Sequence, residues 1–301
     1  GCQAGVLNET NHSAWLGTSQ LHDAQETSRI LEFISLTTGK DIDWLIVDHY
    51  GIDIYWERRL RKFVNKILVI DDLANREHEC NALLDQNYYK NFENRYKKLV
   101  QPSCTQLLGP NYAILRDEFS YYRMFRNNNV AINRVFVFYG GVDRDNETSK
   151  VISALWPYLS AGIQADVIVG QGNPHALTVK LLCEKHDSLN FHFNTKEMAK
   201  ILSGTDLALC AGGSFTWERC AIGIPGIVTS VAENQVLLGE TLSECGAQIY
   251  VGTNKETTVS GYREVIDALL KKPHKLDGMR MKSCEFVDGM GCSRVCTYII
   301  E

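Results

Sequence analysis

Short apolar runs alternate along the chain with longer segments whose apolar residues recur at helical spacing. Each run is short enough to form a buried parallel strand, and several end in polar or glycine-rich turns. The runs lie at residues 43–47, 66–70, 82–84, 135–139, 167–169, 207–210 and 248–251. Helical patterns separate them, for example at 151–159 and 259–271. This alternation predicts an α/β fold with doubly wound, Rossmann-like sheets.

A polar triplet, Asn127-Asn128-Asn129, divides this pattern into two parts. The chain has 301 residues, which is long enough for two domains. We therefore predict a first α/β domain at 1–129 and a second at 130–301 that includes the terminal helices. A doubly wound domain normally opens with a strand, a glycine-rich turn and a helix, and nothing before residue 40 has that pattern. The first domain is therefore expected to be incomplete at its N-terminus.

The segment 206–235 carries the densest set of polar residues at expected strand ends. A buried strand leads into Gly212-Gly213-Ser214, and a helix begins at Ser214 or Phe215. Glycines let the backbone approach a ligand closely, and free amides at a helix start favour an anion. Glu218 lies four residues after Ser214 and so on the same helical face, where a carboxylate can accept ribose hydroxyls. The segment is a candidate nucleotide site, and an ordinary glycine turn without a ligand is the alternative.

Two other strand ends add candidates on the second domain. Asn234 follows the next strand and starts the next helix, so it lies at the sheet edge where open α/β folds bind ligands. Its alternative role is that of a helix N-cap. Gly140-Gly141 follows the strand at 135–139 and can face phosphates from another side, although turn chemistry explains the pair equally well.

On the first domain, the strand at 43–47 ends in Asp48-His49-Tyr50-Gly51. His49 is a candidate general base, since its ordinary pKa is near 6.5 and it follows a carboxylate. The alternative is a histidine that is hydrogen-bonded in a strand-end turn. Tyr50 is a candidate catalytic residue, and packing is the commoner role for a tyrosine at such a position.

Composition and charge narrow the class of partner. The net charge is -5, and no basic run is interleaved with aromatic residues, so the sequence indicates small-molecule rather than nucleic-acid binding. No apolar run approaches the roughly 20 residues of a membrane span, and we expect a cytoplasmic protein without a membrane partner. The ten cysteines contain no Cys-x-x-Cys pair and the histidines are scattered, so reduced thiols and no metal site are expected.

Several separated motifs resemble those of the UDP-sugar hydrolase family of pseudaminic acid biosynthesis. Together they cover most of the chain in the family's order. The matching segments are Asp48-His49-Tyr50-Gly51, 70–76, 83–87, 108–116, Gly140-Gly141-Val142-Asp143, 211–220 and Ala232-Glu233-Asn234-Gln235.

The resemblance implies a two-domain glycosyltransferase-B fold that binds a UDP-sugar and needs no cofactor. It places the diphosphate at Gly212-Gly213-Ser214, the ribose at Glu218, and the sugar toward Tyr50 and Asn234. Water then attacks the anomeric carbon with inversion and UDP departs. In this family a histidine in an opening Gly-x-Gly-His turn is the catalytic base, and we expect the chain to begin after that turn. His49 is a candidate substitute.

Three functions remain open at this point. The first is hydrolysis of a UDP-linked 2,4-diacetamido-2,4,6-trideoxy sugar. The second is glycosyl transfer from a UDP-sugar on the same scaffold, and the third is UDP-sugar binding without catalysis. Their products separate them, because hydrolysis gives free sugar, transfer gives a glycosylated acceptor, and binding gives neither.

Overall fold

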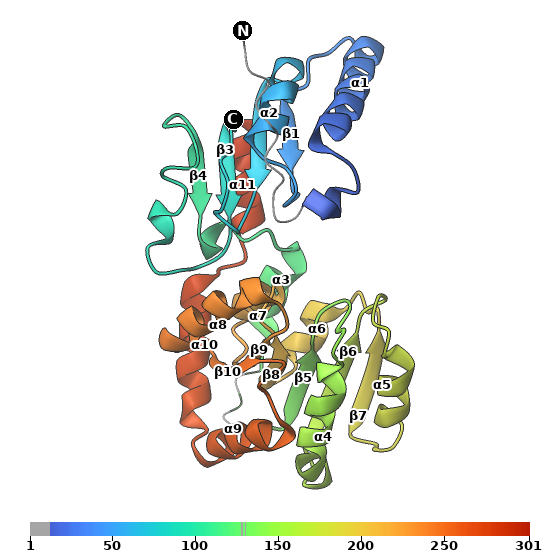
Figure 1. The fold of residues 1–301 in the computed structure, drawn as a ribbon. Coiled ribbons are helices and arrows are strands. Elements are labelled where there is room, and N and C mark those ends of the chain that lie inside the picture. Colours follow the sequence, from blue (N-terminus) through green and yellow to red (C-terminus); the bar gives the residue numbers. More distant parts are fainter. Residues whose placement is uncertain (1–12, 128, 130) are drawn as a thin grey trace. The chain divides into compact units, whose positions relative to one another are not determined.

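The computed structural model describes residues 13–127, 129 and 131–301, and the chain forms two compact units. The first unit runs to Tyr112 and includes Arg294–Glu301, while the second comprises Ala113–Ser293. Each unit contains a parallel sheet with helices packed on it (Figure 1). This arrangement confirms the predicted α/β class with two Rossmann-like domains.

The division between the units differs from the predicted one at both ends. Helix α3 (Asp117–Tyr122) contacts helices α6 (Met198–Ser203) and α7 (Phe215–Ile222) and buries Phe119, so it belongs to the second unit. The predicted boundary after Asn129 therefore comes too late; Asn128 of that triplet lies outside the described residues. The last residues were expected in the second domain, yet Arg294–Glu301 belongs to the first unit.

The sheet of the first unit has four parallel strands in the order β1-β2-β3-β4. Alternate residues of β2 face opposite sides, as strand geometry requires. Ile67 and Val69 pack with α1 and α2, whereas Leu68 packs with Val295 of α11. The strands are Trp44–Val47 (β1), Lys66–Ile70 (β2), Ala82–Asp85 (β3) and Thr105–Leu108 (β4). The helices are Gln20–Thr38 (α1), Ile54–Leu60 (α2) and Gly291–Ile300 (α11).

The sheet of the second unit has six parallel strands in the order β10-β9-β8-β5-β6-β7. The strands β6 and β7 therefore follow β5 on one side of the sheet. The chain then returns to the other side of β5, where it forms β8, β9 and β10. In open α/β sheets this reversal point is where ligands bind. The strands are Arg134–Phe138 (β5), Gln164–Val169 (β6), Leu189–Phe193 (β7), Leu207–Ala211 (β8), Gly226–Ser230 (β9) and Ile249–Thr253 (β10).

Helices cover both faces of this second sheet. Val135 and Val137 of β5 pack with apolar residues of α4, α5 and α9, whereas Phe136 stacks on Phe215 of α7. The fully buried strands explain the continuous apolar runs in the sequence. The remaining helices are Glu147–Ser160 (α4), Ala176–Cys183 (α5), Val236–Glu244 (α8), Val259–Lys271 (α9) and His274–Phe286 (α10).

Asp143 holds the loop after β5 against the start of α4. Its carboxylate accepts hydrogen bonds from the amides of Glu147 and Thr148, at 2.9 and 3.1 Å, and its backbone is left-handed with φ of 44°. We predict that Asp143→Ala lowers the free energy of unfolding by about 1–2 kcal/mol, because two helix amides lose their acceptor. Denaturant unfolding checks this, with Asp143→Asn, which keeps one acceptor oxygen, as the milder control. Equal stability of Asp143→Ala and the unaltered chain would contradict the capping role.

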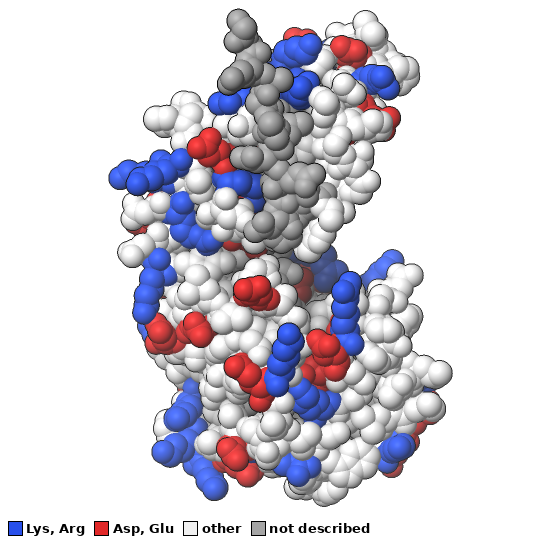
Figure 2. All heavy atoms as spheres, viewed as in Figure 1, with Lys and Arg blue, Asp and Glu red and all other residues white. Residues whose placement is uncertain are grey.

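Charged side chains are mixed on the face of the molecule shown in Figure 2. Lysine and arginine side chains lie among aspartate and glutamate side chains there rather than apart from them. Within residues 13–127, 129 and 131–301, none of the helices combines the length and the apolar character that crossing a membrane requires.

Candidate functional site

A pocket opens in the second unit where the chain reverses direction between β5 and β8. Its volume is about 520 Å³, within the range of about 300–1,000 Å³ that is usual for small-ligand sites. We call it the switch-point pocket. It is lined by Phe138, Gly141, Val142, Ile168, Val169, Gly170, Gln171, Gly172, Asn194, Thr195, Met198, Ser214, Phe215 and Glu218. Four of the predicted site residues therefore come together there, namely Gly141, Ser214, Phe215 and Glu218.

An aromatic cluster forms one wall of the pocket. The ring of Phe215 stacks on Phe136 at 5.4 Å and meets Phe138 edge-on at 5.1 Å. Phe215 is itself buried, so its position is fixed by packing in the unit's core. Because α7 begins at Phe215, this stack holds the start of the helix at the edge of the pocket.

The turn between β8 and α7 is stiff. The Gly212 amide donates to Thr229 O at 3.1 Å, and the Thr216 amide donates to Gly213 O at 2.9 Å. Gly212 and Gly213 do not appear among the pocket's lining residues, but they carry the chain directly to Ser214, which does. Ser214 makes no side-chain cap to α7. The first amides of α7 and its dipole accordingly favour an anion at this end of the helix.

A second glycine turn approaches the pocket from β5 and β6. Gly140 has φ of 88°, a left-handed conformation that other residues adopt with strain, and Gly141 follows it at the pocket wall. Gly170, at the end of β6, lies so close that a Cβ on it would be 2.5 Å from Gly141 Cα and 2.6 Å from Gly141 O. The close approach of Gly170 and Gly141 explains why backbone atoms line this side of the pocket.

Glu218 supplies the carboxylate of the pocket. Burial raises its pKa to about 7; the guanidinium of Arg116 opposes that rise, and the carboxylate of Glu118 adds to it. Arg116 is engaged by Glu118 through an ion pair of 2.6 Å. A half-buried carboxylate of this kind is poised to accept hydrogen bonds from neutral hydroxyl groups.

Asn234 lies elsewhere in the second unit. It is exposed within the short 3-10 helix Glu233–Gln235 and is not among the lining residues of the switch-point pocket. Its predicted alternative role as an N-cap is wrong, because the residue before α8 is Gln235, which makes no side-chain cap. The side chain of Gln235 instead accepts from the Val231 amide at 3.0 Å and lies beside Gly213.

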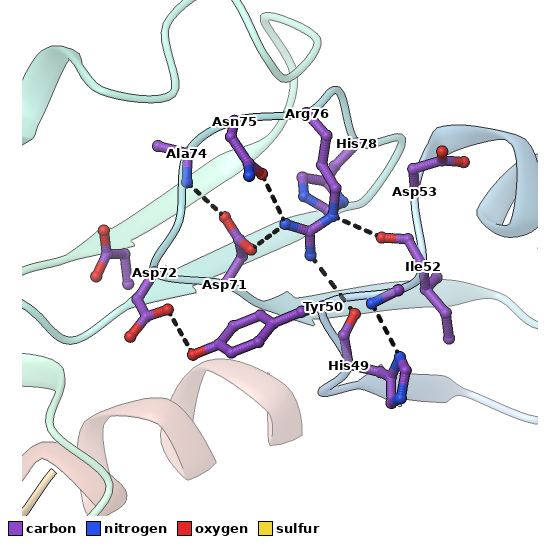
Figure 3. A network of polar contacts seen from close by, with 12 residues as sticks. His49, Tyr50, Ile52, Asp53, Asp71, Asp72, Ala74, Asn75, Arg76 and His78 are labelled. Atoms are coloured by element: carbon purple, nitrogen blue, oxygen red, sulfur yellow. Dashed lines mark hydrogen bonds and ion pairs between the residues drawn. The ribbon is translucent and has the colours of Figure 1, made fainter. Parts of the chain in front are cut away.

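The first unit has its own polar cluster where β1, β2 and β3 end (Figure 3). The Tyr50 hydroxyl donates to Asp72 Oδ1 at 2.7 Å, and Asn87 Nδ2 donates to Asp72 Oδ2 at 2.9 Å. Burial, reinforced by Asp72 and Asp71, raises the pKa of Tyr50 well above its ordinary value. Burial also raises the pKa of Asp72, although the hydrogen bond from Tyr50 lowers it in part. We call these two side chains the Tyr50–Asp72 pair.

His49 precedes Tyr50 in sequence, but its side chain points elsewhere. Its ring points away from Asp71 and Asp72 in Figure 3, and its Nδ1 accepts from the Gly51 amide at 3.0 Å. The hydrogen bond matches the turn-stabilising alternative for His49.

Two further carboxylates complete the cluster around the pair. Asp71 is buried and binds Arg76 Nη1 at 2.6 Å; burial alone raises its pKa, but Arg76 and His78 hold it below the ordinary value. Burial raises the pKa of Asp85 to about 7, and Arg95 lies 3.3 Å from its Oδ2. Among the described residues, no group of three histidine, cysteine, aspartate or glutamate side chains is placed to hold a metal ion.

Several residues of both sites were not among the predicted site residues. Gly170-Gln171-Gly172 and Asn194-Thr195 directly follow strands, and that position was the available signal for their place in the pocket. Asp72 lies just after β2 and Asp85 is the last residue of β3, and both lie in motifs noted above. Their convergence on one cluster depends on the neighbouring positions of β2 and β3 in the sheet.

No family model matches the chain, and two of the curated proteins to which it is similar match it over most of its length. The UDP-2,4-diacetamido-2,4,6-trideoxy-β-L-altropyranose hydrolase of Campylobacter jejuni is 24% identical over 221 residues, covering 73% of this chain and 78% of the relative. The spore coat polysaccharide biosynthesis protein SpsG of Bacillus subtilis is 24% identical over 269 residues, covering 85% of this chain and 76% of the relative.

A solved structure with a similar fold is that of MurG from Acinetobacter baumannii. It matches with a TM-score of 0.61 at 11% identity, covering 92% of this chain and 78% of MurG. The fold is thus of the glycosyltransferase-B type, as the sequence motifs implied.

Proposed function

We propose that this protein hydrolyses a UDP-linked 2,4-diacetamido-2,4,6-trideoxy sugar to UDP and free sugar. The observation that carries the proposal is the switch-point pocket, in which Ser214, just before α7, and Glu218 of α7 meet the glycine turn at Gly141. The similarity to the Campylobacter jejuni hydrolase over 73% of the chain supports a UDP-sugar as the substrate. In this proposal the product enters pseudaminic acid biosynthesis and flagellin glycosylation, and the reaction takes place in the cytoplasm.

The nucleotide half of the substrate is assigned to the second unit. The diphosphate binds at Gly212-Gly213-Ser214, where the amides and dipole of α7 favour negative charge, and at Gly140-Gly141. The ribose hydroxyls donate to Glu218. Phe215 lines this site, and its stack on Phe136 fixes its position. As the sugar–oxygen bond breaks, the same amides stabilise the charge that develops on the departing diphosphate.

Asn234 of the second unit is a proposed contact for the sugar half. Tyr50 and His49 of the first unit are proposed catalytic residues, and His49 is the weaker of the two because its Nδ1 is already bonded to the Gly51 amide. Water attacks the anomeric carbon from the face opposite UDP, so the configuration inverts. The bond that breaks joins the anomeric carbon to the phosphate oxygen. An attacking water needs a group that accepts its proton. The ring of His49 points away from the carboxylates of Asp71 and Asp72 (Figure 3).

Glycosyl transfer and binding without catalysis are the competing functions. Both use the same nucleotide pocket, so a change in UDP affinity does not separate them from hydrolysis. The fold does not separate them either, because fold alone does not define a reaction.

Proton NMR of the chain mixed with UDP-2,4-diacetamido-2,4,6-trideoxy-β-L-altropyranose tests the proposal. We expect the anomeric signal of the sugar nucleotide to disappear while that of the free reducing sugar appears. Broadened uracil signals without turnover would support a binding protein instead. Turnover that requires an added acceptor would support a transferase.

A further inference from the structure

A buried network of hydrogen bonds joins the segments that carry the two glycine turns of the second unit. At its centre is the hydroxyl group of Tyr262, a residue of α9. This hydroxyl donates to Glu147 Oε1 at 2.8 Å, and it is also hydrogen-bonded to the hydroxyl groups of Tyr139, at 3.2 Å, and Thr229. Because Tyr262 gives its one proton to Glu147, its oxygen accepts the protons of the other two hydroxyl groups. We call these four side chains the Tyr262 network.

The polar groups of the Tyr262 network are satisfied by one another and by two further side chains. All four residues are at most 1% exposed. The Glu147 carboxylate accepts two more hydrogen bonds, from the Thr257 hydroxyl at 2.7 Å and from Lys150 Nζ at 2.6 Å. A fully satisfied buried network is rigid, and removal of one member leaves its neighbours without partners where the dielectric constant is low.

The network holds both ends of the loop that follows β5. Tyr139 directly precedes Gly140, and at the other end the amide of Glu147 donates to Asp143 Oδ1 at 2.9 Å. Between these two points the loop places Gly141 at the wall of the switch-point pocket. Glycine leaves the backbone unusually free, so the position of this turn depends on the groups that flank it.

The network also reaches the turn between β8 and α7. The side chain of Thr229, in β9, is bonded to Tyr262, while its backbone oxygen accepts from the Gly212 amide at 3.1 Å. Gly212 and Gly213 lead directly to Ser214, which lines the pocket. Both glycine turns are therefore tied to the same four buried side chains.

We propose that Tyr262 is a positioning residue for the diphosphate of the nucleotide, because its hydroxyl group, through Tyr139 and Thr229, holds the two glycine turns at the spacing that the diphosphate requires. This inference rests on the proposed function only in assigning the diphosphate to the second unit. Tyr262 is not among the lining residues of the switch-point pocket, so it acts through the turns rather than by touching the nucleotide. Amides that are fixed before binding hold an anion more tightly, since the ordering of a mobile turn costs affinity.

The decisive variant is Tyr262→Phe, which removes one oxygen atom and keeps the ring in the core. We expect its affinity for UDP, measured by isothermal titration, to fall about tenfold, because Tyr139 and Thr229 lose their common acceptor. Uridine lacks the diphosphate, so its affinity, measured by proton NMR titration, should stay within about twofold. General damage to the unit would weaken the binding of both ligands equally.

A second pair of variants leaves Tyr262 itself unaltered. Thr229→Val deletes the hydroxyl group and keeps the branched shape, so it should reproduce the selective loss of UDP affinity. Thr229→Ser retains the hydroxyl group and should bind UDP as the unaltered chain does. The backbone oxygen that holds Gly212 is present in both variants, so a difference between them is assigned to the bond with Tyr262.

Tyr158→Phe is the matched control at another contact between α4 and α9. The Tyr158 hydroxyl lies 2.7 Å from Asp267 Oδ1 and 3.2 Å from Arg263 O, and neither partner belongs to the Tyr262 network. This variant should lower the melting temperature and leave the affinity for UDP unchanged. Thermal unfolding of every variant shows that it is folded at the temperature of the binding measurements.

The outcomes separate the positioning role from hydrolysis. If folded Tyr262→Phe and Thr229→Val both bind UDP within about threefold of the unaltered chain, or lose uridine affinity as much as UDP affinity, the positioning role is overturned. If the unaltered chain binds UDP but releases no free sugar, hydrolysis fails and the same affinities still decide the positioning role. An unaltered chain that binds no UDP overturns both. Loss of UDP affinity alone in Tyr262→Phe and Thr229→Val, with normal binding by Thr229→Ser, is the predicted result.

Discussion

Glu218→Gln weakens UDP binding at pH 8 by about 10- to 100-fold, as expected for the loss of charge-assisted hydrogen bonds worth about 1.5–3 kcal/mol. The variant keeps the size of the side chain and one acceptor oxygen. The loss is therefore assigned to charge rather than to shape. Isothermal titration with UDP measures the effect directly.

The same variant should also abolish the pH dependence of the affinity for UDP. Burial places the pKa of Glu218 at about 7, so the free protein carries the ionised, better accepting form mainly above that pH. The affinity of the unaltered chain for UDP should therefore fall by about tenfold from pH 8 to pH 6. Glu218→Gln should show no such change, and Glu118→Gln, which removes a neighbouring negative charge, should shift the midpoint to lower pH.

The stability of the protein should change with pH in the direction opposite to its affinity for UDP. A carboxyl whose pKa is raised on folding binds more protons in the folded state than in the unfolded state, so stability falls as pH rises through the interval between the two values. Glu218→Gln removes this penalty, and its melting temperature should exceed that of the unaltered chain at pH 8 but not at pH 4. A lower melting temperature at pH 8 together with unchanged UDP affinity would contradict the binding role of Glu218.

Gly170→Ala is expected to lower the free energy of unfolding by about 3 kcal/mol, because overpacking against backbone forces the chain to move. The added methyl would lie 2.5 Å from Gly141 Cα, where no flexible side chain can give way. The shift of the β5 turn should also weaken UDP binding. Denaturant unfolding and UDP titration provide the two measurements.

Gly141→Ala is the matched control for this prediction. A Cβ on Gly141 meets no heavy atom within 4 Å, and its backbone is not left-handed. We therefore expect Gly141→Ala to keep the stability of the unaltered chain while it weakens UDP binding, because the methyl occupies space at the pocket wall. Equal free energies of unfolding of the two variants would show that the close approach of Gly170 and Gly141 does not require a glycine at position 170.

Periodicity predicts much of the second unit correctly. The apolar runs at 135–139 and 207–210 become β5 and β8, and the residues that follow them, Gly141 and Ser214, meet at the pocket. This succeeds because parallel strands share one carboxyl edge, so residues after strands gather there whatever the order of the strands. Glu218 is predictable for a similar reason, since helical spacing places it beyond Ser214.

Other features depend on tertiary contacts that sequence patterns do not encode. The place of α3 follows from the burial of Phe119 in the second unit rather than from the polar triplet after it. The helix α1 has apolar residues at helical spacing, yet Ile30 and Phe33 are exposed and Leu31 is buried. The link between Tyr50 and Asp72 joins the ends of two strands, and only their neighbouring positions in the sheet reveal it.

The most direct test of the central claim is turnover of the UDP-linked 2,4-diacetamido-2,4,6-trideoxy sugar in water enriched in oxygen-18, followed by mass spectrometry of both products. Attack of water on the anomeric carbon predicts free sugar that carries one heavy oxygen and UDP that carries none. Label in UDP instead of the sugar, or no release of sugar while UDP binds, would contradict the account.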